Sequence, residues 1–179
     1  MSKTENYNFM TILLHWLTVA LVIGLFALGL WMEELDELHE WYRRAPHLHA
    51  SMGIVLLGLT LFRLVWVFIT PKPGPVEGAA HWEHIVTTLV HSLLYLLLLL
   101  VTLSGYLVAT SDGNSIMVFK LFEIPALPWQ FEEQEDIAEE VHEILAFGLI
   151  GLMILHMLAA FKHHFISKDN VLKRMLGKS

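Results

Sequence analysis

Four long apolar stretches dominate this chain, and each has the length that a helix needs to cross a membrane. They cover residues 9–32, 49–69, 86–110 and 141–161. A helix spans the ~30 Å hydrocarbon core of a bilayer with about 20 residues. Because 55% of the 179 residues are hydrophobic, too little polar sequence remains to cover four such helices in water. The sequence therefore predicts an all-α fold, a transmembrane four-helix bundle built as one membrane-embedded domain over residues 1–179.

Lysine and arginine are distributed unevenly between the segments that connect these stretches. If the N-terminus is cytoplasmic, four spans return the C-terminus to the same side. The cytoplasmic basic residues are then Lys3, Arg63, Lys72, Lys162, Lys168, Lys173, Arg174 and Lys178. The outer ones are Arg43, Arg44 and Lys120. Cytoplasmic segments of membrane proteins are enriched in Lys and Arg, so we expect both termini to be cytoplasmic.

Histidines at two matched depths are the main candidates for ligand chemistry. The chain has no cysteine, which excludes disulfides and cysteine-held iron–sulfur clusters, and it has 11 histidines. His49 and His142 lie at the outer starts of the second and fourth stretches, and His15 and His156 lie toward the inner side of the first and fourth. Fourteen residues separate His142 from His156, which is close to four helical turns. Both imidazoles therefore leave one helix face, roughly 21 Å apart along the axis.

These paired histidines predict two haem groups. An ionisable side chain inside a membrane helix is costly and marks a functional site by default. A six-coordinate haem takes one imidazole on each face, and the absence of an open iron position favours electron transfer over oxygen chemistry. The expected pairs are His49 with His142 on the outer side and His15 with His156 on the inner side. A single membrane histidine is more often a helix–helix hydrogen-bonding residue or a proton relay, but four at matched depths favour haem.

Three arginines are candidates for the haem propionates. Arg63 follows His49 by fourteen residues and lies on nearly the same face at the inner end. It could bind propionates or serve as an interfacial anchor. Arg43 and Arg44 are placed to serve the outer propionates.

Further histidines lie on the inner side. His91 could replace His15 as a ligand, hydrogen-bond a propionate or quinone, or cap backbone groups. His163 and His164 could bind a quinone carbonyl or carry its protons, because histidine titrates near neutral pH. They could equally be interfacial side chains.

With these residues in place, the chain resembles the bacterial cytochrome b561 family, the short four-helix dihaem proteins of the inner membrane. The motifs that carry the resemblance extend over nearly the whole chain: His15-Trp16, His49 with Gly53 and Arg63, His91-x-x-x-Tyr95, His142-Glu143…Gly151…His156, and His163-His164-Phe165…Lys168-Asp169-Asn170…Leu172…Arg174-Met175. The resemblance implies a multi-pass protein of the bacterial inner membrane with two haem b groups. The ligand pairs that it implies agree with those expected from depth.

The resemblance also implies an activity. One type of member looks like a superoxide oxidase, an oxidoreductase that takes an electron from superoxide outside and reduces ubiquinone inside. Quinone would then bind near the inner haem, around His163 and the surface between Arg63 and Lys168. The related cytochrome subunits of hydrogenases and formate dehydrogenases imply the alternative, an electron-transfer or anchor subunit that docks a dehydrogenase or c-type cytochrome. Membrane lipid, quinone and a soluble redox partner are the expected partners; nucleic acid is not, and no catalytic residue is assigned.

The outer segments are strongly acidic. Their main carboxylates are Glu33, Glu34, Asp36, Glu37, Glu40, Glu132, Glu133, Glu135, Asp136, Glu139 and Glu140. A surface that collects superoxide should be positive, because opposite charge focuses an anionic substrate and raises its rate of association. Arg43 and Arg44 could provide a local positive entrance, but the acidic segments favour a cationic donor or partner. They could also be a solvated face that keeps the loops out of the bilayer.

Overall fold

Four long helices make up most of the computed structural model, which describes residues 6–71, 74 and 81–178. The helices are α1 (Phe9–Glu33), α2 (Arg44–Ile69), α3 (His81–Ala109) and α4 (Gln134–Lys162). Within the described residues, these four are long and apolar enough to cross a membrane. They confirm the predicted helical membrane bundle. Lys3 and Lys72, used above for the orientation, lie outside the described residues.

Three of the helices begin earlier than the apolar stretches predict. α2 begins at Arg44 instead of near residue 49, α3 at His81 instead of 86, and α4 at Gln134 instead of 141. A helix does not end where its sequence becomes polar, since its backbone hydrogen bonds continue into the headgroup layer. Pro46 is tolerated in the first turn of α2, where its missing N–H would have no partner within the helix. The Gln134 side chain anchors the start of α4 by donating to the Leu107 carbonyl at 3.0 Å.

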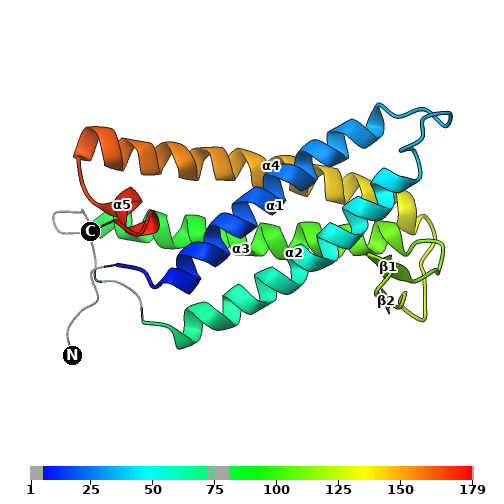
Figure 1. Cartoon of the computed structure of the whole chain (residues 1–179), viewed down its shortest axis with the longest axis horizontal. Helices are drawn as coiled ribbons and strands as arrows, with labels where there is room; N and C mark the ends of the chain where they lie inside the picture. Colours follow the sequence, from blue (N-terminus) through cyan, green and yellow to red (C-terminus); the bar gives the residue numbers. More distant parts are fainter. Residues whose placement is uncertain (1–5, 72–73, 75–80, 179) are drawn as a thin grey trace.

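The two ends of the bundle carry different elements (Figure 1). At one end, the short antiparallel strands β1 (Ile116–Val118) and β2 (Phe122–Ile124) form a hairpin. At the other end, α4 passes into the π-helical turn η1 (His163–Ser167), which leads to α5 (Val171–Met175) beside the start of α1. We call these the hairpin end and the tail end.

The long helices pack as a chain of neighbours. α1 packs on α2, α2 on α3 and α3 on α4. Among the described residues, α4 has no comparably close backbone packing with α1 or α2. Large side chains make the contact between α1 and α4 instead: the ring centroids of Phe26 and Phe147 are 5.3 Å apart. The buried apolar cluster lies midway along the helices and consists of Val22, Leu25, Leu56, Leu98, Val101 and Leu149. It separates the histidines of one end from those of the other.

Candidate cofactor sites

At the hairpin end, His49 of α2 and His142 of α4 face each other across the bundle. Their ring centroids are 6.1 Å apart, and the ring planes are inclined by 77°. Imidazole nitrogens bind metals at about 2 Å, so two rings that hold one iron from opposite sides have centres about 6 Å apart. The observed separation therefore fits an iron between the two rings.

Hydrogen bonding orients the His142 ring. Its Nδ1 lies 2.8 Å from the Val101 carbonyl oxygen and 3.2 Å from the Ser104 hydroxyl. An Nδ1–H that donates to the carbonyl leaves the lone pair on Nε2, the nitrogen then available to a metal. Such outer hydrogen bonds also raise the basicity of a metal-binding histidine. In His49, Nδ1 is buried and has no hydrogen-bond partner among the described residues.

The two rings lie in a cavity of about 720 Å³ that is lined by all four long helices and by Ile116 of the hairpin. Glycine brings the backbone close to both imidazoles. A Cβ atom at Gly29 would lie 3.5 Å from Cε1 of His49, and one at Gly105 would lie 2.8 Å from Cε1 of His142. The cavity, the paired rings and the unpartnered Nδ1 of His49 together fit a macrocycle held through two axial imidazoles.

Charged side chains line the same cavity. Arg43 is one of them, whereas Arg44 is the first residue of α2 and is not part of the lining. The carboxylates of Glu33, Glu139 and Glu143 line the cavity as well. The mostly apolar lining of the cavity therefore includes one arginine suited to a propionate, and more carboxylates than arginines.

At the tail end, three imidazoles come together instead of the expected two. The centroids of His15 and His156 are 6.5 Å apart, a separation that also suits an iron between them. His91 of α3 is closer, with its ring centroid 5.1 Å from that of His156. Trp16 packs edge-on to His15 at 5.3 Å. The geometry thus keeps His91 as an alternative partner for His156, as the sequence does.

The Arg63 side chain contacts an aromatic ring in the tail-end half of the bundle. Its guanidinium lies 5.3 Å from the centroid of the Tyr95 ring, in a cation–π contact between α2 and α3. Tyr95 follows His91 by four residues and so lies on the same face of α3. This contact keeps a positive charge near the tail-end histidines.

The end of α4 shows a contact that the sequence did not single out. His163 Nδ1 and Asp169 Oδ2 are 2.5 Å apart. Lys168 between them has a left-handed backbone with φ of 56°, and its N–H donates to the His163 carbonyl. His163 and Lys168 were expected near a quinone, but Asp169 was missed as a partner of His163. Six residues do not place two side chains on one helix face, so the pairing depends on this turn.

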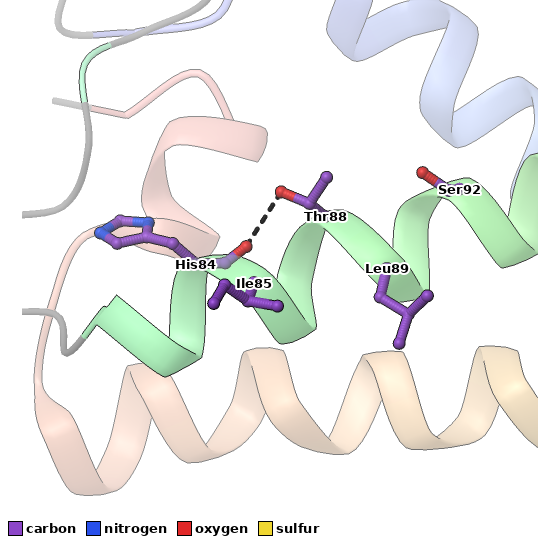
Figure 2. Close-up of a pocket in the computed structure, with 5 residues that line it drawn as sticks. All are labelled: His84, Ile85, Thr88, Leu89 and Ser92. Carbon is purple, nitrogen blue, oxygen red and sulfur yellow. Dashed lines mark hydrogen bonds between the residues drawn. The ribbon is translucent and has the colours of Figure 1, made fainter.

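A shallow hollow of about 470 Å³ lies on the tail-end half of α3 and is lined by His84, Ile85, Thr88, Leu89 and Ser92 (Figure 2). Thr88 and Ser92 point to one side of the helix, whereas Ile85 and Leu89 point to the other. The Thr88 hydroxyl donates to the His84 carbonyl at 2.9 Å and is satisfied by its own helix. The hollow therefore has an apolar edge and a hydroxyl edge. Ser92, on the hydroxyl edge, directly follows His91 in the sequence.

Comparison with known proteins identifies the family. The model of the family described as prokaryotic cytochrome b561 matches residues 6–178. The chain belongs to the prokaryotic cytochrome b561 family. It is 43% identical to cytochrome b561 homolog 2 of Escherichia coli K12, over 98% of this chain and 93% of that protein. It is 30% identical to the probable superoxide oxidase CybB of Yersinia pestis, over 97% of each.

A third relative, cytochrome b562 of Cereibacter sphaeroides, is 28% identical over 98% of each chain. Membership of the cytochrome b561 family makes this chain a membrane protein that binds haem b and transfers electrons. The cavity around His49 and His142 fits that cofactor on geometric grounds, independently of the family.

Proposed function

We propose that this cytochrome b561 family member holds two haem b groups and carries electrons from a donor at the hairpin end to ubiquinone at the tail end. The observation that carries this proposal is the presence of two facing imidazole pairs at opposite ends of the bundle, at 6.1 and 6.5 Å. α4 supplies one histidine to each pair, His142 and His156. Bound haem supplies a one-electron carrier whose iron, held by two imidazoles, has no open position.

The protein's own residues position and insulate these sites. The Val101 carbonyl fixes the tautomer and the orientation of His142. Arg43 and Arg63 supply positive charge for the propionates, each at a different end. The apolar cluster between the two ends excludes water from the space between the histidine sets. The ligands on α4 are roughly 21 Å apart along its axis.

The hairpin end is proposed to face the outside of the bacterial inner membrane, and the tail end the cytoplasm. Lysines and arginines support this orientation. Those at or after the end of α4 are Lys162, Lys168, Lys173, Arg174 and Lys178, and those of the hairpin-end segments are Arg43, Arg44 and Lys120. Cytoplasmic flanks are enriched in such residues.

The electron donor has two candidates. Superoxide is supported by the relative named probable superoxide oxidase CybB. The other candidate is a soluble cationic redox protein, for which this cytochrome would be the electron-transfer or anchor subunit. It is supported by the carboxylates of Glu33, Glu139 and Glu143, which line the hairpin-end cavity. The response of haem reduction to salt separates the two.

Haem content of ligand variants tests the proposed sites. Unmodified protein should contain two haem b per chain, measured as pyridine haemochrome against protein concentration. His49→Ala and His142→Ala should each lose the same haem and keep the other. His15→Ala and His156→Ala should lose the second haem instead. His81→Ala, at the exposed start of α3, is the matched control and should keep both haems.

Two outcomes would reject this arrangement. One haem per unmodified chain would remove the dihaem proposal, and loss of the same haem from His49→Ala and His156→Ala would remove the pairing. His91→Ala decides the remaining choice at the tail end. If His91→Ala loses the second haem while His15→Ala retains it, His91 is the ligand in place of His15.

A further inference from the structure

The β1–β2 hairpin ends in an apolar tip that the bundle does not cover. We call residues 119–122 the hairpin tip: Phe119, Lys120, Leu121 and Phe122. Val118, just before the tip, is 1% exposed, whereas Leu121 is 80% exposed and both phenylalanines are only half-buried. Large apolar side chains that gather on a protein surface mark a site of contact with another protein or with a membrane.

The turn at this tip has an uncommon backbone. Phe119 and Lys120 both have a left-handed conformation, and the Leu121 N–H closes the turn by donating to the Val118 carbonyl at 2.9 Å. Such turns ordinarily contain Asn, Asp or Gly, because these residues adopt positive φ at little cost. Here an aromatic ring and a lysine occupy the strained positions. Strain of this kind is frequent where a protein binds or reacts with something.

The link to α2 sets the depth of the hairpin along the bundle. The Ser51 hydroxyl bonds the backbone of Met117 and Phe119. Ser51 follows the first residue of α2, Arg44, by seven residues, which is about 10 Å along the helix axis. Figure 1 shows both strands beside the helix ends instead of beyond them. The hairpin therefore lies alongside the membrane span, near the level of His49.

We propose that the hairpin tip is a membrane anchor. Phe119, Leu121 and Phe122 insert into the lipid leaflet at the hairpin end. The Lys120 ammonium group binds phosphate groups of the phospholipids there. Aromatic side chains are enriched at the level of the headgroups, and a lysine can lie along apolar neighbours while its charged end reaches the phosphates. Such an anchor requires only a membrane-spanning bundle, whichever donor and acceptor the haem groups serve.

The charge of the tip favours lipid over a cationic partner protein. Lys120 forms no ion pair within the part of the chain that the structure describes. The carboxylate nearest to it in the sequence, that of Glu123, accepts the Ser115 hydroxyl at 3.1 Å. A positive charge between large apolar side chains is typical of segments that lie in the membrane interface, where anionic headgroups attract it. The same charge repels a basic protein.

The strand β2 limits how deeply the tip can enter the bilayer. β1 and β2 form a two-stranded sheet, so among the described residues β2 has no partner strand at its outer edge. Open sheet edges do not occur within the hydrocarbon core, because their unpaired backbone groups are costly there. The backbone of the hairpin therefore lies at the boundary between headgroups and acyl chains, and only the apolar side chains of the tip enter the hydrocarbon.

A second copy of the chain and a partner protein are the competing occupants of the tip. Either one would cover the tip with protein and keep both water and lipid away from it. A tip inserted into lipid is shielded from water but remains in contact with acyl chains. Measuring contact with water and contact with lipid separately therefore decides between the occupants.

Contact with water is measured through an introduced thiol, since the chain has no cysteine of its own. Leu121→Cys protein that contains haem is placed in nanodiscs of phosphatidylcholine and phosphatidylglycerol and reacted with a water-soluble polyethylene glycol maleimide. Leu38→Cys is the matched control: this leucine is 96% exposed in the acidic connection between α1 and α2, which extends past the strands (Figure 1). Leu96→Cys, exposed midway along α3, is the reference for hydrocarbon.

Contact with lipid is measured on unmodified protein. The nanodiscs then include phosphatidylcholine with a photoreactive diazirine in the acyl chain, and mass spectrometry locates the crosslinked peptides after illumination. Haem content and haem absorption bands are recorded for each variant, so that only folded protein is compared.

We expect Leu121→Cys to lose most of the maleimide reactivity of Leu38→Cys while remaining more reactive than Leu96→Cys. In denaturing detergent the three should react alike. The photoreactive lipid should crosslink to the hairpin tip. Adding Lys120→Glu to Leu121→Cys should speed the labelling and reduce the crosslinking, whereas Lys120→Arg should change neither. A neighbouring carboxylate disfavours the reactive thiolate and by itself slows labelling, so faster labelling reports loss of lipid contact.

Three results would overturn the anchor. Labelling of Leu121→Cys as fast as that of Leu38→Cys would place the tip in water. Slow labelling without any lipid crosslink at the tip would show that protein covers it, and a second copy of the chain would then be the occupant in nanodiscs of purified protein. Unchanged labelling and crosslinking in Lys120→Glu would remove the role given to its ammonium group.

Discussion

At the scale of single residues, the contact between His142 Nδ1 and the Val101 carbonyl decides how the hairpin-end site can be built. The bond at 2.8 Å fixes the ring against α3, so His142 cannot move away from that helix without losing it. Gly105 of α3 lies directly against the same ring. The absence of a side chain at this one position therefore allows α3 and the His142 imidazole to approach each other.

Gly105→Ala should weaken haem binding at the hairpin end. The added Cβ would lie 2.8 Å from His142 Cε1, which is too close, so the ring must shift and its bond to Val101 must lengthen. Loss of such an orienting bond costs about 10- to 100-fold in metal affinity. The measurement is haem content together with the absorption bands of the two haems. Gly148→Ala, where nothing lies within 4 Å of the new Cβ, is the control and should retain full haem.

Retention of both haems with unaltered bands in Gly105→Ala would contradict this account of the site.

Helix periodicity and depth were enough to predict the four proposed ligands, because these depend only on position along each helix. Gly105 could not be predicted in this way, since its role depends on how α3 is rotated against α4. Asp169 was missed for a related reason: the left-handed Lys168 folds it back onto His163, and the sequence carries no glycine or asparagine at that position to signal such a turn.

At the scale of elements, the hairpin is the feature that hydropathy did not reveal. Its turn uses Phe119 and Lys120 at φ of 48° and 61°, where a sequence signal would be Asn-Gly or a similar pair. The backbone conformation is stabilised from outside the hairpin. The buried Ser51 hydroxyl of α2 accepts the Phe119 N–H at 3.2 Å and donates to the Met117 carbonyl at 3.4 Å. The spans themselves follow from composition, because each must satisfy its backbone inside lipid.

Ser51→Ala should therefore loosen the hairpin. The Phe119 N–H would lose its partner in a partly buried position, at a cost of about 1–2 kcal/mol. We expect a lower thermal unfolding midpoint in detergent and faster proteolysis between β1 and β2. Ser115→Ala removes an exposed hydrogen bond to Glu123 in the same hairpin and is the matched control, with an effect within about 0.5 kcal/mol. Equal effects of both changes would show that the link to α2 contributes nothing.

At the scale of the whole molecule, charge is separated along the bundle axis. The hairpin-end segments hold most of the carboxylates of the chain, and the tail end holds most of its lysines and arginines. A field of this kind acts on the rate at which charged donors approach, and it weakens beyond the ~8 Å screening length of physiological salt. The donor can therefore be characterised by its response to ionic strength.

Haem reduction by superoxide should become faster as salt is added, because the acidic end repels an anion. Reduction by a small basic ferrous c-type cytochrome should become slower by about tenfold or more from low to physiological salt, as for other steered associations. Stopped-flow absorbance at the haem bands measures both rates, and an uncharged quinol serves as the donor without a salt response. A superoxide rate that falls with salt would show that the positive charge of Arg43 outweighs its acidic surroundings.

The weak backbone packing of α4 against α1 and α2 has a consequence for biosynthesis. Each proposed iron site takes one imidazole from the first two helices and one from the last. A nascent chain that has inserted only α1 and α2 can hold a macrocycle from one side at most. On the proposed pairing, stable haem capture therefore waits until α4 has left the ribosome, because the second imidazole of each site is on that helix.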